Sequence, residues 1–471
     1  MSRKISYSII IILILAILGG IAYFFFYANN PAPQGNTGGS TISVQNPFVP
    51  FGGSGVNNNQ GSNSSGTNST STIANNGQIY QYPKVREIWP TPVGGFVAST
   101  TASSTFVRFV DRGTGYVYDM NMASATPANI SNTTVPLVYE SYWNSNGMSG
   151  IFRYIKEGGD DITNFYVQLR STAATTNTPA SAKASLGKKT ASSTATTTPA
   201  SLKTSYAGQG TSTTATTSIP SILTAPILSQ TPYVLRGTYF PGNIISVAVS
   251  PKGNQLFTVE NVNGNGVGFI SNFDGSGSKQ IFSTPLTQIN AFWPSASTLM
   301  LSTKASSNSA GYLYSINVKT GVMSEVFGGL GGLSILANPK AQLVLYSDLS
   351  SSGNLVASLY NIKTSSSQDL PFVTLADKCV WSKQNPVDLY CAVPSSAPTG
   401  YPDAWYEGTA SGVDQIIEVD TDTGSIHLVS SLAKDARTQI DAEWLALDPS
   451  ERFLYFVNKR DLSLWSVDLN Q

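Results

Sequence analysis

A short pattern recurs about every 45 residues through the second half of this chain. Each copy holds a hydrophobic strand, a turn with Pro, Asn or Gly, and a second hydrophobic strand. The clearest copies are residues 247–257, 291–301, 335–345 and 445–455. The turn prolines of the first three copies stand at positions 251, 294 and 339, so the spacings are 43 and 45 residues. A period of this size is typical of the blades of a β-propeller.

About seven such units fit between residue 84 and the C-terminus once a low-complexity insert is set aside. We expect blades near residues 85–130, 135–240, 244–288, 289–332, 333–377, 378–440 and 441–471. The last unit ends one strand short of a four-stranded blade, so we expect Tyr82 to Trp89 to supply that strand and close the ring. The sequence therefore predicts an all-β fold, a single propeller over residues 80–471 with seven four-stranded blades. Six or eight blades are the alternatives, because the first two units are weakly patterned.

The third strand of several units ends in a turn of Asp, Asn, Thr and Gly, as in residues 311–321 and 415–424. Period-two alternation before such a turn is typical of a half-buried strand that enters a hairpin. With the turns at residues 250–253 (Ser-Pro-Lys-Gly) and 448–451 (Asp-Pro-Ser-Glu), the repeats resemble the WD40-like repeats of TolB-type and YVTN-type extracytoplasmic propellers. The resemblance covers roughly residues 85–471. It implies a fold and not a function, because these families share a scaffold that hosts many roles.

An apolar run without charged residues extends from Ile5 to Tyr27. As a helix it is long enough to cross roughly 30 Å of hydrocarbon. Arg3 and Lys4 precede it, so the positive-inside tendency places residues 1–4 in the cytoplasm. We therefore expect an uncleaved transmembrane signal-anchor over residues 5–27, with the chain single-pass in the cell membrane and its propeller outside. A cleaved signal peptide is the alternative, but its apolar region usually has only about 7–15 residues.

Two low-complexity segments flank or interrupt the repeats. Residues 28–79 are rich in Asn, Gly, Ser and Thr and carry no charge, which predicts a flexible linker. Residues 48–51, Phe-Val-Pro-Phe, interrupt it and either form a short docking motif or do nothing. Residues 171–230 are rich in Thr, Ala and Ser and predict a disordered insert between two strands of one blade. This insert is either a solvated loop or an arm that contacts the cell wall.

Signals of catalysis and of nucleic-acid binding are weak. The net charge is zero, which gives no indication of a nucleic-acid partner. The single histidine, His427, lies in an alternating segment where we expect it to face solvent or pack lightly, and one histidine cannot build an HExxH site. The segment from Asp420 to Gly424 favours a hairpin turn over a calcium loop, because the twelfth position is Ser431. We therefore predict no catalytic residue, no metal and no cofactor.

One loop and one cysteine pair stand out as candidate sites. The sixth unit contains an acidic and aromatic segment that could contact a partner, since loops on a propeller face often bind ligands. Its candidate contact residues are Tyr401, Asp403, Trp405, Tyr406 and Glu407. Packing over the rim explains the same residues equally well.

Cys379 and Cys391 are the only two cysteines, and their midpoint falls on Asn385 in a predicted turn. A symmetric hairpin would place them directly opposite one another, close enough for a disulfide. The proposed location outside the membrane would let such a bond persist. The alternative is two buried free thiols, and a one-residue slip of register would place them on opposite faces.

These observations favour a membrane-tethered binding or scaffold module for an envelope protein or a wall polymer, with the membrane contacted through the N-terminal helix. Two other classes stay open. One is a lactonase-like or glycan-cleaving propeller enzyme that uses channel carboxylates. The other is a structural component of a surface assembly. Three or more acidic side chains that converge at one mouth of the channel would favour the enzyme.

Overall fold

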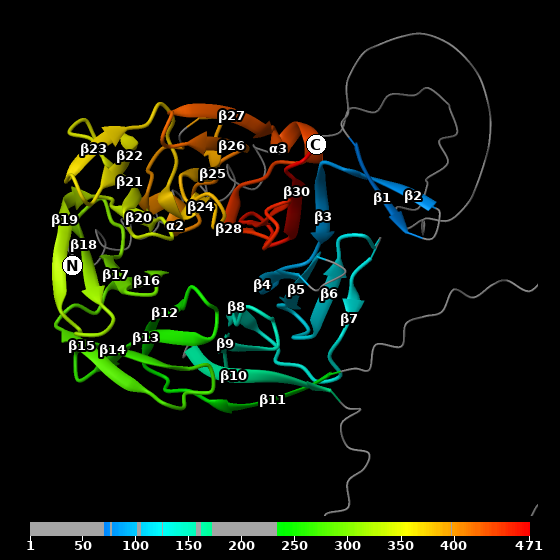
Figure 1. The fold of residues 1–471 in the computed structure, drawn as a ribbon, viewed down its shortest axis with the longest axis horizontal. Helices are drawn as coiled ribbons and strands as arrows, with labels where there is room; N and C mark the ends of the chain where they lie inside the picture. Colours follow the sequence, from blue (N-terminus) through cyan, green and yellow to red (C-terminus); the bar gives the residue numbers. More distant parts are fainter. Residues whose placement is uncertain are drawn as a thin grey trace, which may run out of the picture. The chain divides into compact units, whose positions relative to one another are not determined.

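The computed structural model describes residues 70–75, 78–100, 105–124, 126–156, 162–171, 233–396 and 398–471. These residues lie in one compact unit, Thr67–Gln471. In this unit seven four-stranded antiparallel sheets follow one another around a ring (Figure 1). The predicted all-β, seven-bladed propeller is therefore confirmed. The expected cytoplasmic stub and anchor helix, the expected linker except residues 70–75 and 78–79, and all but the first residue of the expected insert lie outside the described residues.

Six sheets each use four strands that are consecutive in the sequence, and the first strand of each lies toward the centre of the ring (Figure 1). The first three are β4–β7 (Val93–Thr100, Thr105–Asp111, Val117–Asn121, Ala128–Asn129), β8–β11 (Val138–Trp143, Ser149–Ile155, Ile162–Ser171, Tyr233–Tyr239) and β12–β15 (Ile244–Val249, Gln255–Val262, Asn265–Asn272, Lys279–Thr284). The next three are β16–β19 (Ile289–Ser295, Thr298–Thr303, Ala310–Asn317, Met323–Gly331), β20–β23 (Ser334–Ala337, Leu343–Leu349, Leu355–Asn361, Ser366–Asp369) and β24–β27 (Cys379–Trp381, Asp388–Pro394, Asp414–Asp420, Ser425–Ser430).

The seventh sheet closes the ring with a strand from the other end of the propeller. It contains β28 (Ala442–Leu447), β29 (Phe453–Asn458), β30 (Leu464–Asp468) and β3 (Val85–Trp89). Val85 pairs with Val467 in the antiparallel register of β3 and β30. The predicted closing strand is thus confirmed over Val85–Trp89, whereas Tyr82 and Pro83 belong to a strand of another sheet. The expected blade at 85–130 needs correction at its start, because β3 belongs to the last sheet and the first blade begins at Val93.

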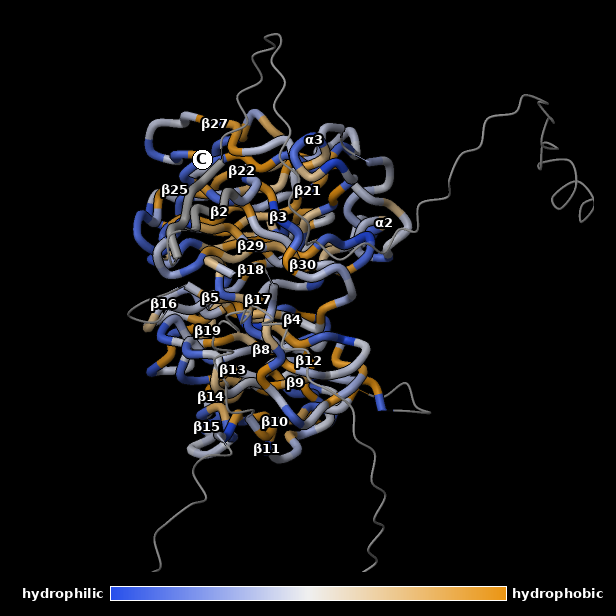
Figure 2. Tube along the Cα trace, turned by 90° about the vertical axis from the view of Figure 1, so that its right-hand side faces the viewer, coloured by the Kyte–Doolittle hydropathy of each residue, from blue (hydrophilic) through white to orange (hydrophobic). Residues whose placement is uncertain are grey.

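The hydrophobic core lies between neighbouring sheets. Except at its outer edge, each blade packs against a neighbouring blade on both faces. Strand β29 shows this most clearly, since all six of its residues are buried. Its Tyr455 packs with Phe109 of β5 and Val93 of β4, in the adjacent sheet. Figure 2 shows hydrophobic stretches along β29 and β30. Such continuous apolar runs are expected of strands buried on both faces.

The flanks of the expected insert are neighbouring strands of one sheet. Strands β10 and β11 pair antiparallel, and Ser171 at the end of β10 lies opposite Tyr233 at the start of β11. The prediction that the insert joins two strands of a single blade is confirmed.

Three short helices and one hairpin complete the described structure. The helices are η3 (Ala376–Lys378), α2 (Asp403–Tyr406) and α3 (Leu432–Ala436). Strands β1 (Thr70–Asn75) and β2 (Gln78–Pro83) form a separate two-stranded sheet that begins inside the range expected as linker. Among the residues with a described structure, no helix has the length and apolar character needed to span a membrane.

Candidate functional site

The connection between β25 and β26, residues 395–413, is called here the α2 loop because it carries helix α2. It extends from its own blade across the neighbouring blade to a third one. The Asp403 carboxylate accepts hydrogen bonds from the backbone N–H of Ser307, at 2.9 and 3.2 Å, in the turn between β17 and β18. Pro402 lies against Gly332, where a Cβ atom would come within 3.0 Å of the proline ring. Gly332 also has a φ of +69°, so glycine is favoured here by its backbone conformation as well as by the close approach.

The inner side of the α2 loop is part of a small hydrophobic core. Tyr401 and Trp405 are only 6% and 3% exposed, and they pack with Leu355 and Leu375 of the blades beneath. Two of the five candidate contact residues therefore pack over the rim and cannot act as exposed anchors in this conformation.

The outer side of the α2 loop carries the other three candidates. Tyr406 is 41% exposed, Glu407 is exposed and Asp403 is half-buried. The Tyr406 hydroxyl donates a hydrogen bond to the carboxylate of Asp377, which is itself exposed. This bond fixes the aromatic ring on the surface, so the loop presents one aromatic and two acidic side chains in a defined arrangement.

A fully buried lysine lies beneath the α2 loop. Lys378, the last residue of η3, has an exposed fraction of 0%, and its Nζ lies 2.8 Å from Oδ2 of Asp414. The same ammonium also donates a hydrogen bond to Oδ1 of Asp441. Asp414 is the first residue of β26, whereas Asp441 directly precedes β28 of the next blade. The lysine therefore links two blades.

Both carboxylates accept further hydrogen bonds. Asp441 accepts from the indole N–H of Trp405 at 3.2 Å and from the backbone N–H of Gly412 at 3.0 Å. Asp414 accepts from the backbone N–H of Ala442 at 2.7 Å. A buried charge is tolerated only when it is paired and hydrogen-bonded in this way.

The buried cluster holds one lysine against two aspartates. Burial raises the pKa of Asp414 to about 6, even though Lys378 favours its ionised form. Asp441 adds to the rise because a second negative charge nearby disfavours ionisation. Asp414 therefore exchanges its proton close to neutral pH.

A second lysine flanks the same aromatic ring. The Nζ of Lys459 lies 4.4 Å from the centroid of the Trp405 ring, and that of Lys378 lies 5.6 Å from it. Lys459 also pairs with Glu443 at 3.6 Å. Burial raises the pKa of Glu443, and the lysine opposes this rise. Trp405 thus lies among charged groups of both signs.

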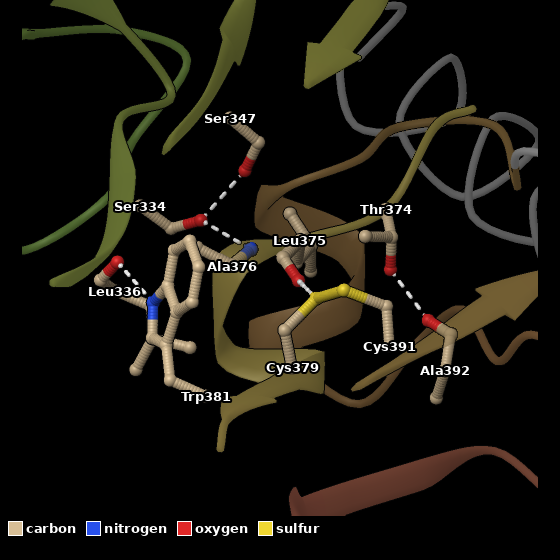
Figure 3. Close-up of a disulfide and its surroundings, with 10 residues drawn as sticks. All are labelled: Ser334, Leu336, Ser347, Thr374, Leu375, Ala376, Cys379, Trp381, Cys391 and Ala392. Carbon is tan, nitrogen blue, oxygen red and sulfur yellow. Dashed lines mark hydrogen bonds between the residues drawn. A yellow bond between two sulfur atoms is a disulfide. The ribbon is translucent and has the colours of Figure 1, made fainter. Parts of the chain in front are cut away.

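The cysteine pair lies next to Lys378 in the chain. Cys379 and Cys391 are direct partners in the register of β24 and β25. Their sulfurs are bonded at 2.07 Å and their Cα atoms are 4.1 Å apart (Figure 3). The hydroxyl of Thr374 donates to the carbonyl of Ala392 at 2.6 Å, beside the disulfide (Figure 3). These bonds attach the chain on both sides of Lys378 to β25, the strand that leads into the α2 loop.

Two smaller expectations are confirmed by the geometry. His427 is exposed on β27, as expected, although burial does not alternate there, since Ile426 and Leu428 on this outer strand are exposed as well. The Asp420 carboxylate accepts from the backbone N–H groups of Asp422 and Thr423, at 2.9 and 3.1 Å, so this segment is a hairpin turn. Within the described part of the chain, no group of three or more His, Cys, Asp or Glu residues is arranged to hold a metal ion.

Sequence reasoning did not find the cluster of Lys378, Asp414 and Asp441. The local sequence gives no clear signal, because Lys378 directly follows the exposed Asp377 and the two look like an ordinary pair of surface charges.

No family model matches this chain. No curated protein matches it either. Among solved structures it is similar to TolB from Acinetobacter baumannii (9% identity, TM-score 0.37, covering 73% of this chain and 64% of that one). It is also similar to oligogalacturonate lyase from Vibrio parahaemolyticus (7% identity, TM-score 0.45, covering 85% and 96%). A puromycin-hydrolysing peptidase from Mycobacterium tuberculosis is a third example (12% identity, TM-score 0.39, covering 82% and 55%).

TolB is thus among the similar structures, as the resemblance of the repeats implies. The chain spans about two thirds of the length of that TolB and about half that of the peptidase. At these identities the likeness concerns the propeller fold alone, and propellers host unrelated activities.

Proposed function

We propose that this protein is an extracytoplasmic binding or scaffold module, which recognises an envelope protein or a wall polymer with the propeller face that carries the α2 loop. The observation that supports this proposal is the way in which the loop is held. Buried hydrogen bonds to Asp441, the packing of Trp405 and the contact with Ser307 fix it across three blades.

A loop fixed in this way suits recognition, because little conformational entropy remains to be lost on binding. Tyrosine is a common anchor of protein interfaces, since it offers a large contact area and a polar tip. Tyr406 is such a residue, and Asp403 and Glu407 beside it give the surface an acidic character. A partner that presents basic or hydroxyl groups would fit this surface.

The enzyme alternative needs carboxylates that can reach a substrate. The two carboxylates that converge beneath the α2 loop, Asp414 and Asp441, are both buried and both bind Lys378. They hold the loop in place, so binding is the function that the geometry supports best.

The proposed location is outside the cell membrane, with the N-terminal segment as anchor. The bond between Cys379 and Cys391 supports this location, because disulfides persist mainly in oxidising compartments. The charge-free run from Ile5 to Tyr27 supports the anchor.

The test is proximity labelling in intact cells with the full chain, in three forms. They are the natural protein, a double variant with Tyr406→Ala and Glu407→Lys, and the control variant Tyr239→Ala. Tyr239 is 71% exposed and lies on the outer strand β11, so its removal matches the loss of a surface tyrosine elsewhere.

We expect a set of envelope components that the natural protein and the control label, and that the double variant labels at least about tenfold less, as for removal of an interface anchor. The melting temperatures of all three forms should agree, which excludes unfolding as the cause. Equal labelling by all three forms would show that this face does not bind the partner.

A further inference from the structure

The cluster of Lys378, Asp414 and Asp441 has the composition of an acyl-transfer site. It places a primary amine beside one carboxyl group that the amine can attack and a second carboxyl group that can accept and donate a proton. We propose that Lys378 and Asp441 join spontaneously in the folded propeller, forming an amide bond between Nζ and Cγ with Asp414 as the catalytic residue. The bond would be a covalent link between two neighbouring blades, separate from the proposed binding function.

The reaction balances without any other reagent. The ammonium of Lys378 first gives a proton to the carboxylate of Asp441, which leaves a neutral amine and a carboxylic acid. The nitrogen lone pair then attacks Cγ of Asp441, and Asp414 takes a proton from the nitrogen. Asp414 returns this proton to the departing hydroxyl, which leaves as water. One C–N bond forms, one C–O bond breaks, and no group is oxidised or reduced.

The contacts of Asp441 suit the acceptor role. Its Oδ1 accepts from the attacking Nζ, and its Oδ2 accepts from the backbone N–H of Gly412 at 3.0 Å. The indole N–H of Trp405 lies 3.2 Å from Oδ2 and equally far from Oδ1. Two donors on one oxygen can stabilise the negative charge that develops there when a tetrahedral intermediate forms. Asp414 accepts from a single backbone N–H, that of Ala442.

The position of Asp414 suits the proton carrier. Its two oxygens lie 3.0 and 2.8 Å from Nζ of Lys378, which is within reach for a direct proton transfer. Its pKa, raised to about 6 by burial, supports this role, because a group that exchanges its proton near the working pH is an efficient acid and base.

The surroundings favour the forward reaction. Lys378 and Asp441 are both 0% exposed, and Asp414 is 3% exposed. Trp405 of the α2 loop donates to Asp441, and Tyr401 belongs to the same small hydrophobic core as Trp405. A site that excludes water opposes hydrolysis of the product.

The test is mass spectrometry of the full-length protein, purified in detergent, with the disulfide reduced and alkylated. Loss of water lowers the intact mass by about 18 Da, as expected for condensation of an amine with an acid. Trypsin should also fail to cleave after Lys378, since its amine is acylated. The diagnostic product would then join residues 364–383 to residues 438–452, the two tryptic peptides that contain the linked side chains.

Three variants complete the experiment. Lys378→Met should have the full sequence mass, whereas Lys459→Met should keep the link. The side chain of Lys459 borders the same tryptophan and pairs with Glu443, and the substitution keeps the backbone N–H that Lys459 donates to the carbonyl of Asp441. Asp414→Asn keeps a side-chain oxygen that can accept from the backbone N–H of Ala442. This variant should nevertheless form the link at least about tenfold more slowly, as for removal of a general acid and base.

The natural protein alone can overturn the proposal. Recovery of its full sequence mass, with efficient cleavage after Lys378, would show that the cluster is only an ionic contact. A mass loss that persists in Lys378→Met, a link to Asp414, or a link formed at the natural rate in Asp414→Asn would overturn the assigned roles.

Discussion

Trp405 is a neutral side chain that contacts charged groups of both signs. Its indole N–H donates to both oxygens of Asp441, and its ring lies near the ammonium of Lys459. The edge of an indole attracts anions and its face attracts cations, so one residue can satisfy both. The sequence leaves a surface anchor and packing over the rim equally open here, because a tryptophan in an acidic loop looks the same in either setting. Its partner Asp441 lies 36 residues away and in another blade.

The disulfide is the candidate feature for which residue positions alone were informative. Cys379 and Cys391 share one hairpin, so their midpoint fixes their register. The ionic cluster is the opposite case. Lys378 meets Asp414 and Asp441 across 36 and 63 residues, and only the packing of two blades brings these side chains together. No local pattern predicts such contacts.

The first prediction concerns the disulfide. Replacement Cys379→Ser should lower the free energy of unfolding by roughly 2–3 kcal/mol, because the bond restricts the unfolded chain. Urea denaturation under non-reducing conditions measures the difference. Cys391→Ser should give a similar loss, and the double variant should lose little more, since all three lack the same bond. Full alkylation of both thiols in unfolded, unreduced natural protein would rule the bond out.

At the level of elements, the repeat predicted most strands but not the path of the α2 loop. Strands follow from period-two alternation and turn residues, which are local signals. The loop follows this path because Asp403 accepts a hydrogen bond from Ser307 and Pro402 packs against Gly332. Both of these contact residues lie in or beside blades that come earlier in the chain. The start of the first blade was missed for a related reason. Strand β3 resembles the strands after it, and only its pairing with β30 assigns it to the last sheet.

The second prediction concerns that pairing. Deletion of residues 84–90 should abolish cooperative melting of the propeller, because Val85 and Ile88 are 3% and 4% exposed and belong to two inter-blade cores. The unpaired edge of β30 should also promote aggregation. Deletion of residues 29–66, taken from the sequence predicted to be a linker, is the control and should leave the melting temperature unchanged. Thermal denaturation followed by circular dichroism measures both, and equal tolerance of the two deletions would contradict the role of β3.

At the scale of the whole molecule, charge is scarce and balanced. Charged residues make up 11% of the chain against about 25% in an average protein, and their sum is zero. The few buried charges are correspondingly informative, since each needs a partner. Within the described residues they join neighbouring blades in more than one place. Arg108 pairs with Asp119 and also donates, at 2.7 Å, to the carbonyl of Gly147 in the turn between β8 and β9 of the next blade.

The third prediction concerns the orientation of the molecule in the cell. Arg3 and Lys4 before the apolar run should keep the N-terminus in the cytoplasm and place the propeller outside. Protease added to intact cells or spheroplasts should then degrade a C-terminal tag while an N-terminal tag survives. Detergent lysis should expose both tags. Protection of the C-terminal tag in cells whose envelope admits the protease would contradict this orientation.

The closing strand is synthesised at the start of the propeller, and its partner at the end. Strand β3 begins at Val85, whereas β30 begins at Leu464. The two can pair only when β30 has left the ribosome, so β3 stays unpaired while the strands of the six other sheets are made. For a chain that is exported as it grows, the seventh sheet can therefore be completed only after all the others have been synthesised, in the compartment that receives β30.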